Sequence, residues 1–198
     1  MNTNIILSGV GGQGILTIAA ALDTAALIEN LNIKQSEVHG MSQRGGAVQS
    51  HVRISDKEIF SDLIPEGKAD LILSVEPMEL LRYMPFLKKK GWIITDSKPF
   101  INTANYPDQE QIYDQIKKHP NHVIVNATDL AKEIGNSKMA NMVLLGAASH
   151  IIPLTEESLV KSINKLFKHK SEKLIRLNVE AFYKGKEVAS NYNKANFI

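Results

Sequence analysis

A glycine-rich turn between a strand and a helix is the feature that most constrains how this chain folds. Residues 4–8 have an apolar centre at 5–7 and the length of a buried strand, and residues 15–30 have the pattern of a helix. Between them, Gly9, Gly11 and Gly14 have the G-x-G-x-x-G spacing in the strand–helix context that this motif requires. In this motif the first glycine permits a tight turn, and the second lets the backbone come close to a phosphate-sized group. The third glycine lets the helix pack on the strand. The helix start then offers free N–H groups to an anion.

The rest of the chain alternates between strand and helix patterns. We expect strands over 32–38, 47–54, 70–75, 92–95 and 123–126. We expect helices over 77–87, 109–118, 128–134, 138–151, 156–167 and 171–190, and a loop over 101–107. A turn at Asp56-Lys57 predicts that 47–54 pairs with Glu58, Ile59 and Phe60 in an antiparallel hairpin, and Gly91 is predicted to end the element before 92–95.

This order of elements predicts an α/β fold of the three-layer, Rossmann-like kind. We expect a mainly parallel sheet with an antiparallel hairpin addition and C-terminal helices. The 198 residues fit a single domain, 1–198, with about 155–198 as a helical extension packed on it. The predicted helix 138–151 is rich in small apolar residues, so we expect it to be buried or to contact a second helix closely.

Composition excludes several kinds of chemistry. The chain has no cysteine, which excludes disulfides, thiolate nucleophiles and cysteine-ligated zinc or iron–sulfur clusters. Its net charge is +2, but the residues from Lys161 onward carry a surplus of six positive charges. Those lysines fall on a helix with an apolar opposite face, so we interpret them as a solvated face and expect no nucleic-acid binding. With no apolar stretch of 18 residues and no signal-like start, we expect a cytoplasmic protein without a membrane span.

A second glycine-rich stretch, residues 36–46, has few residues suited to a core. Between Glu37 and Gly46 it mixes polar or flexible side chains with glycines, which is typical of a surface that touches a ligand or partner. Glu37 lies roughly where a dinucleotide-binding fold places its ribose-binding acid. Arg44 is either a phosphate clamp or a charge beside a turn.

Three further polar residues have both a functional and a structural interpretation. A lone His39 or His51 is more often a hydrogen-bonded structural histidine than a base or metal ligand. Asp96 ends a strand at the edge where such sheets bind ligands, but it equally suits a helix cap.

Several motifs together resemble a known family. They are Gly-Val-Gly-Gly-Gln-Gly-Ile-Leu at 9–16, Ser-Glu-Val-His-Gly-Met-Ser-Gln-Arg-Gly-Gly at 36–46, His-Val-Arg at 51–53, and the segments 65–70, 76–82 and 141–147. In this order they resemble the small subunit of the indolepyruvate:ferredoxin oxidoreductases and, more broadly, the gamma subunit or domain of the 2-oxoacid:ferredoxin oxidoreductases. The likeness is good over about residues 4–100; beyond Thr155 it is only a helical pattern.

The resemblance implies a subunit of an enzyme that decarboxylates arylpyruvates oxidatively with coenzyme A, giving an aryl-acetyl-CoA, carbon dioxide and reduced ferredoxin. It implies that thiamine diphosphate and the iron–sulfur clusters lie on a large partner subunit, in a heterotetramer, and that the isolated chain is inactive. We expect a homodimer when the partner is absent. We assign no catalytic residue and no metal ligand to this chain.

The residues expected to face the partner or a cofactor come from the two glycine-rich stretches. They are Gly9, Gly11, Gly12, Gln13, Gly14, Glu37, His39, Met41, Gln43, Arg44, Gly45 and Gly46. The alternative is a free-standing Rossmann-like protein that binds FAD or NAD through the same glycines, with Glu37 on the ribose. A third interpretation is a structural partner whose glycine turn binds nothing.

Overall fold

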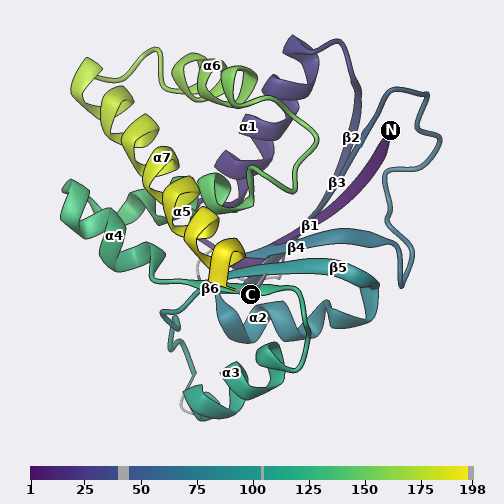
Figure 1. The fold of residues 1–198 in the computed structure, drawn as a ribbon, viewed down its shortest axis with the longest axis vertical. Helices are drawn as coiled ribbons and strands as arrows, with labels where there is room; N and C mark the ends of the chain where they lie inside the picture. The colour runs from purple at the N-terminus through teal and green to yellow at the C-terminus, as the bar shows by residue number, and fades with distance from the viewer. Residues whose placement is uncertain (40–44, 104, 196–198) are drawn as a thin grey trace.

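A six-stranded sheet forms the centre of the computed structural model, which describes residues 1–39, 45–103 and 105–195 (Figure 1). The strands are β1 (Asn2–Val10), β2 (Asn32–His39), β3 (Ala47–Ser55), β4 (Ala69–Ser74), β5 (Leu87–Asp96) and β6 (His122–Val125), in the order β2-β3-β1-β4-β5-β6. β1, β4, β5 and β6 pair in parallel, whereas β3 is antiparallel to both β1 and β2. β2 therefore runs in the same direction as β1, with β3 between them.

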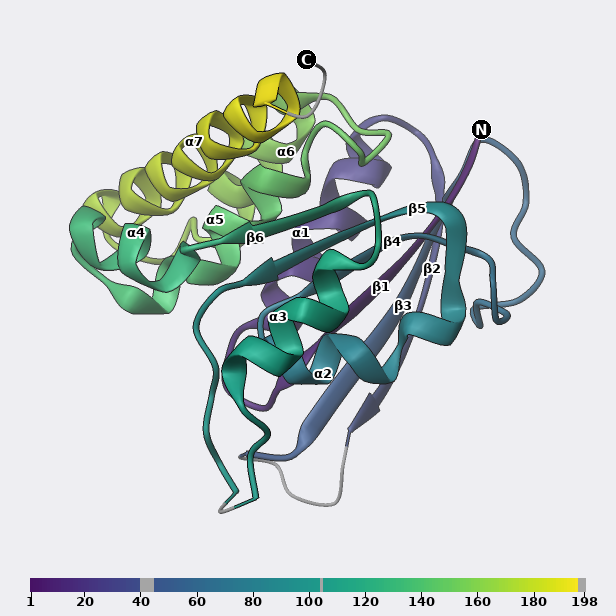
Figure 2. The ribbon, with the colours of Figure 1, turned by 60° about the horizontal axis from the view of Figure 1, so that its bottom comes forward.

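Helices cover both faces of this sheet, which gives three layers (Figures 1 and 2). One face carries α1 (Ile15–Ile28), α5 (Ala140–Ala148) and α7 (Glu172–Ala195), with α6 (Glu156–Leu166) packed on α1 and α4 (Ala127–Ile134) on α5. The other face carries α2 (Pro77–Arg82) and α3 (Gln109–Lys117), and short 3-10 turns span Met84–Phe86 and Ser137–Met139. The α/β fold class, the mainly parallel sheet and the C-terminal helices are confirmed.

Alternation along the central strands supplies a core to each face. On β1, Ile5 and Leu7 belong to the larger core under α1, α5 and α7, whereas Ile6 belongs to the smaller core under α2 and α3. Successive side chains of a strand point to opposite faces, so a strand covered on both sides needs apolar residues at every position. Residues of the C-terminal region, including Leu159 and Phe182, are part of the larger core.

The close helix contact expected for 138–151 is made by α7 of the same chain. A Cβ built on Gly146 would overlap the carbonyl of Phe182, and one built on Gly185 would overlap the carbonyl of Val143. The two helices therefore touch backbone to backbone where the two glycines meet. None of the helices in the described ranges has both the length and the apolar character needed to cross a bilayer.

The predicted antiparallel hairpin between 47–54 and 58–60 is wrong, because β3 has other partners. Residues 58–60 form no strand, and β3 instead pairs with β2 and β1. The segment after β3 is held by side chains: the Arg53 guanidinium donates to the carbonyl of Ser61 (2.8 Å), and the Ile64 N–H donates to His51 Nδ1 (3.0 Å). These side-chain bonds, rather than strand pairing, attach the segment that follows residues 58–60 to β3.

Two other boundaries also differ from prediction. Gly91 lies inside β5, so it does not end an element as we predicted. A Cβ at this position would lie 3.0 Å from the carbonyl oxygen of Ala69. The helix that we expected over 77–87 ends at Arg82, and β5 begins at Leu87.

Candidate functional site

The glycine turn after β1 requires glycine for contacts within the chain. A Cβ on Gly9 would overlap the side chain of Val75 and lie 3.0 Å from Ile15 of α1, so this first glycine serves the helix–strand packing. Gly14 has φ +83° and faces Asn141 of α5: its Cβ would lie 2.5 Å from the amide nitrogen of Asn141, which donates to the carbonyl of Gly14 (3.2 Å). The prediction that Gly14 permits helix–strand packing is therefore corrected, because its close neighbour is another helix.

Hydrogen bonds within the chain use much of the polar capacity of this turn. Gln13 folds back on it: its side-chain oxygen accepts from the Val10 N–H (2.8 Å), and its side-chain nitrogen donates to the carbonyl of Val75 (3.4 Å). The Gly11 N–H, which the motif would aim at a phosphate, donates to the carbonyl of Gly46 (2.9 Å). The turn is thus closed by its own side chain and by the second glycine stretch.

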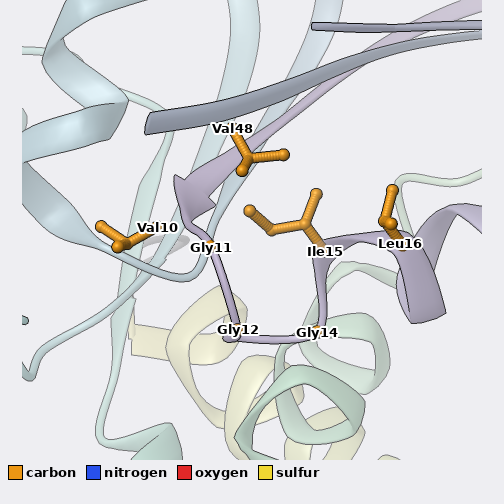
Figure 3. Close-up of a pocket in the computed structure, with 7 residues that line it drawn as sticks. All are labelled: Val10, Gly11, Gly12, Gly14, Ile15, Leu16 and Val48. Atoms are coloured by element: carbon orange, nitrogen blue, oxygen red, sulfur yellow. The ribbon is translucent and has the colours of Figure 1, made fainter. Parts of the chain in front are cut away.

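A pocket of about 270 Å³ lies between this turn and β3 (Figure 3). Apolar side chains and glycine backbone line it: Val10, Gly11, Gly12, Gly14, Ile15, Leu16 and Val48. Figure 3 shows the side chains of Ile15 and Val48 pointing toward one another across it. No charged residue of the described ranges contributes to this lining, so the pocket suits an apolar group better than a charged phosphate.

The described residues of the second glycine stretch, among them Gly45 and Gly46, lie at the same edge of the sheet as the first stretch. β1 and β2 run in the same direction, so their carboxyl ends share an edge, and the bond between Gly11 and Gly46 joins the two stretches there. Gly45, with φ +78°, accepts a hydrogen bond on its carbonyl from the side chain of Asn102 (2.6 Å). His39 ends β2, and the predicted site residues Met41, Gln43 and Arg44 lie outside the described residues.

Glu37 does not have the position that ribose binding requires. Its carboxylate accepts from the side chain of Gln35 (3.4 Å), and it pairs in register with Ser50, which in turn pairs with Leu7. Two inter-strand steps of about 4.8 Å place Glu37 about 10 Å from β1, whereas a dinucleotide-binding sheet has its second strand beside the first. The inserted strand β3 thus weighs against the FAD or NAD alternative.

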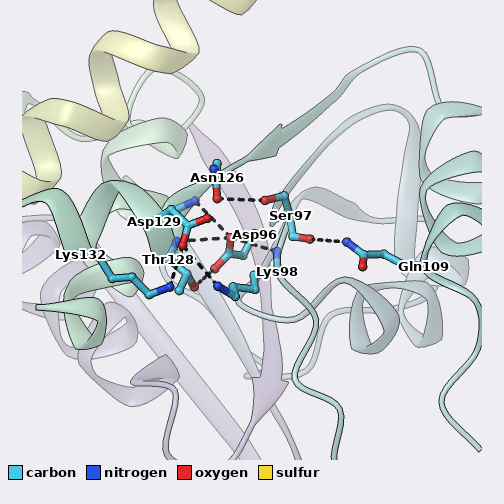
Figure 4. A network of polar contacts seen from close by, with 9 residues as sticks. Asp96, Ser97, Lys98, Gln109, Asn126, Thr128, Asp129 and Lys132 are labelled. Carbon is cyan, nitrogen blue, oxygen red and sulfur yellow. Dashed lines mark hydrogen bonds and ion pairs between the residues drawn. The ribbon is translucent and has the colours of Figure 1, made fainter.

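Asp96, the last residue of β5, caps the start of α4 with its side chain, although the residue at the N-cap position is Asn126 (Figure 4). It is only 2% exposed, and its carboxylate accepts from the N–H groups of Lys98 (3.2 Å), Ala127 (3.1 Å) and Thr128 (3.4 Å) and from the Thr128 hydroxyl. Burial raises the pKa of Asp96, and these hydrogen bonds act against that rise. A carboxylate engaged by four donors has a structural role, so the capping interpretation holds and the ligand interpretation does not.

His51 also has a structural role. Besides accepting from Ile64, its ring packs edge-on against Phe86, with ring centroids 5.6 Å apart. Burial lowers the pKa of His51, because the charged form loses its hydration. The neutral ring is the form that can accept the Ile64 N–H, so the bond and the pKa agree.

Glu76 is a residue at this edge whose role our sequence analysis missed. It is 0% exposed, and one carboxylate oxygen caps α2 by accepting from the Glu79 N–H (2.7 Å). The other oxygen accepts from the Phe100 N–H (3.4 Å) and from the Tyr106 hydroxyl, in the loop after β5. Burial is the main cause that raises the pKa of Tyr106, and the hydrogen bond to Glu76 raises it further. The Tyr106 hydroxyl therefore stays protonated and acts as a donor. An acidic residue directly before Pro77 at a helix start was the available signal.

Comparisons with known proteins agree with this architecture. The chain belongs to the pyruvate ferredoxin/flavodoxin oxidoreductase family, whose model matches residues 4–188. The chain is 40% identical over 196 residues to the indolepyruvate oxidoreductase subunit IorB of Pyrococcus horikoshii, covering 94% of this chain and 95% of that one. The family resemblance inferred from the motifs is therefore confirmed, and the relatives are subunits of oxidoreductases.

Solved structures show the same fold. The gamma subunit of a keto/oxoacid ferredoxin oxidoreductase from Geobacter sulfurreducens matches with a TM-score of 0.67 and 26% identity, covering 96% of this chain and 99% of that one. The 2-oxoglutarate:ferredoxin oxidoreductase of Magnetococcus marinus, described with 2-oxoglutarate, coenzyme A and succinyl-CoA bound, matches with a TM-score of 0.78 and 22% identity. The match covers 96% of this chain but 31% of that longer chain.

Proposed function

We propose that this chain is the small subunit of a cytoplasmic indolepyruvate-type oxidoreductase, which decarboxylates arylpyruvates oxidatively with coenzyme A and passes the electrons to ferredoxin. The observation that carries the proposal is the 40% identity to an indolepyruvate oxidoreductase subunit over nearly the full length of both chains. The partner is a large subunit, in a heterotetramer, and the isolated chain has no activity of its own.

The residues of this chain do not fit the redox cofactors of such an enzyme. The chain has no cysteine to hold an iron–sulfur cluster, and the glycine turn uses the Gly11 N–H and the Gln13 amide within the chain. We therefore assign thiamine diphosphate and the clusters to the large subunit, and coenzyme A to the complex as a co-substrate. Thiamine diphosphate supplies carbanion chemistry that no side chain here replaces.

The role left to this chain is to dock beside the active site of its partner. The two glycine stretches meet at the carboxyl edge of β1 and β2, around an apolar pocket with the half-exposed Leu16 on its wall. In our proposal Gly9, Gly11, Gly12, Gln13, Gly14, Gly45 and Gly46 shape this surface, and Glu37, His39, Met41, Gln43 and Arg44 complete it, with Arg44 holding an anionic group.

Co-expression with the large subunit tests the proposal. Copurification of both chains, with anaerobic reduction of a viologen dye that needs both chains, indolepyruvate and coenzyme A, would support it. Arg44→Ala should weaken assembly or turnover; unchanged values for both would remove that residue from the site. Tight binding of NAD or FAD by the chain alone, without assembly, would instead support the nucleotide-binding alternative.

A further inference from the structure

The loop after β5, described over residues 97–103 and 105–108, presents two neighbouring apolar side chains to solvent. Phe100 is 44% exposed and Ile101 is 70% exposed. The loop leaves the carboxyl end of β5 and lies at the same end of the sheet as the start of β3 (Figure 2). Single exposed apolar residues are ordinary, but an adjacent pair at the edge where a ligand or partner binds in such sheets needs an explanation.

Side-chain hydrogen bonds hold this loop in place. The Glu76 carboxylate accepts from the Phe100 N–H and the Tyr106 hydroxyl, one on either side of Ile101. At the start of the loop, the Ser97 carbonyl accepts from the Tyr113 hydroxyl and from the side chain of Gln109 (3.2 Å). Burying a carboxylate is costly unless donors surround it, so the fold commits a fully buried Glu76 to fixing a loop whose apolar residues point outward.

The loop is also joined to the glycine stretches. The Asn102 side chain donates to the Gly45 carbonyl, and the next carbonyl, that of Gly46, accepts from the Gly11 N–H. These hydrogen bonds, together with the short chain segments between them, thus connect Glu76 through the loop to the glycine turn. The exposed pair is therefore continuous with the surface proposed above to face the large subunit.

We infer that Phe100 and Ile101 are a third element of that docking surface and that Glu76 is the residue that positions them. This inference rests on the proposed function. The occupant is the large subunit: the relatives are subunits of an oxidoreductase, and in the Magnetococcus enzyme the matching part covers 31% of a longer chain. Two apolar side chains on a fixed loop lose little conformational freedom on docking, which favours their use as anchors.

A matched pair of variants tests the inference. Ile101→Asp places a charge on the proposed surface, and Phe60→Asp places one at a side chain that is 86% exposed in the 56–68 segment, at the opposite end of the sheet. We expect Ile101→Asp to weaken binding to the large subunit at least about tenfold, which is the scale of an interface anchor, and Phe60→Asp to change it less than about twofold. Both variants should unfold at the temperature of the wild type, because both positions are exposed.

Glu76 is tested by a conservative and a non-conservative variant. Glu76→Gln keeps an oxygen that can accept from Phe100 and Tyr106, so it should retain more binding than Glu76→Ala at equal helical content. Binding equally reduced by both variants would show that the bonds from Phe100 and Tyr106 are not what Glu76 contributes and would overturn its positioning role, while the Ile101→Asp test would still decide the anchors.

The outcomes separate the inference from the proposed function. If the wild-type chain forms no complex with the large subunit, the proposed function fails. If the wild type binds and Ile101→Asp binds as tightly as Phe60→Asp, the docking role of the loop is overturned while the proposed function stands. If Ile101→Asp abolishes only self-association of the isolated chain, measured by sedimentation, the occupant is a second copy and the inference is overturned.

Discussion

Gly14 gives a quantitative test of the glycine turn, because its backbone conformation and its close neighbour both oppose a side chain. At φ +83°, alanine costs about 1–2 kcal/mol relative to an unstrained residue. Its Cβ would also lie 2.5 Å from the amide nitrogen of the buried Asn141. Displacing that amide loses its hydrogen bond to the Gly14 carbonyl and leaves a buried polar group unpaired, at about 1–3 kcal/mol. We expect Gly14→Ala to lower the free energy of unfolding by about 2–5 kcal/mol.

Gly12→Ala is the matched control. Gly12 also has positive φ, +101°, but no atom lies within 4 Å of the position that its Cβ would take. It should therefore show only the conformational cost, about 1–2 kcal/mol, so the two variants should differ by about 1–3 kcal/mol. Asn141→Ala removes the obstacle, so its effect and that of Gly14→Ala should be less than additive in the double variant.

Urea unfolding of the purified chain, followed by circular dichroism, measures all four variants and the wild type. In thermal unfolding, each kcal/mol corresponds to about 2–4 °C for a chain of this size. If Gly14→Ala proves no less stable than Gly12→Ala, or if the cycle with Asn141→Ala is additive, the contact with α5 is not the reason for glycine at this position.

Three further predictions concern packing, pH and capping. Gly146→Ala should lower the free energy of unfolding by at least about 1 kcal/mol, despite the better helix propensity of alanine, because its Cβ overlaps the carbonyl of Phe182; a raised urea midpoint would contradict this. Burial holds the pKa of His51 below 6.5 in the folded chain, so between that lowered value and 6.5 the unfolded chain binds more protons. The contribution of the neutral His51 ring to stability is thus fully present above pH 6.5 and decreases as the pH falls. His51→Gln should therefore flatten the dependence of the unfolding free energy on pH between about pH 7.5 and about pH 5. Equal slopes for the variant and the wild type would count against the role of the ring. Asp96→Ala should cost about 1–2 kcal/mol and accelerate hydrogen exchange in the first turn of α4, and unchanged exchange there would show that the cap is dispensable.

Local patterns predicted most elements of the fold but not the strand order. The alternation of residues 47–54 and the apolar run 70–75 correspond to β3 and β4 within a residue or two, because burial of one or both faces imposes those patterns directly. Whether β3 pairs with 58–60 or with β1 and β2 depends on contacts far apart in the sequence. The pairing of β3 with β1 joins Ala47 to Val10 and Ser55 to Asn2, which no local pattern encodes. Arg53 and His51 then hold the segment after β3 through side-chain bonds to its backbone.

At the candidate site, the sequence predicted which positions need glycine for close packing, but not which residues pack against them. Gly9 and Gly14 were predicted to need glycine, and they do, but their neighbours Val75 and Asn141 lie far along the chain. The same limit applies to Glu76, because its donors Phe100 and Tyr106 belong to a loop with no periodic pattern. A glycine or an acid can be found in a sequence, whereas its burial and its partner become known only with the topology.

The inserted strand β3 explains why a dinucleotide-type glycine spacing is compatible with a different use of the turn. In a dinucleotide-binding sheet, the backbone at the second glycine approaches a pyrophosphate, and the neighbouring strand supplies an acid for the ribose. Here β3 occupies that neighbouring place, and the carbonyl of Gly46, just before it, accepts the Gly11 N–H. The donor that would bind phosphate thus joins two loops of the protein, and Glu37 lies one strand further out. The glycine spacing therefore indicates that the backbone of the turn comes close to another group. The order of the strands decides whether that group is a bound phosphate or another loop of the protein.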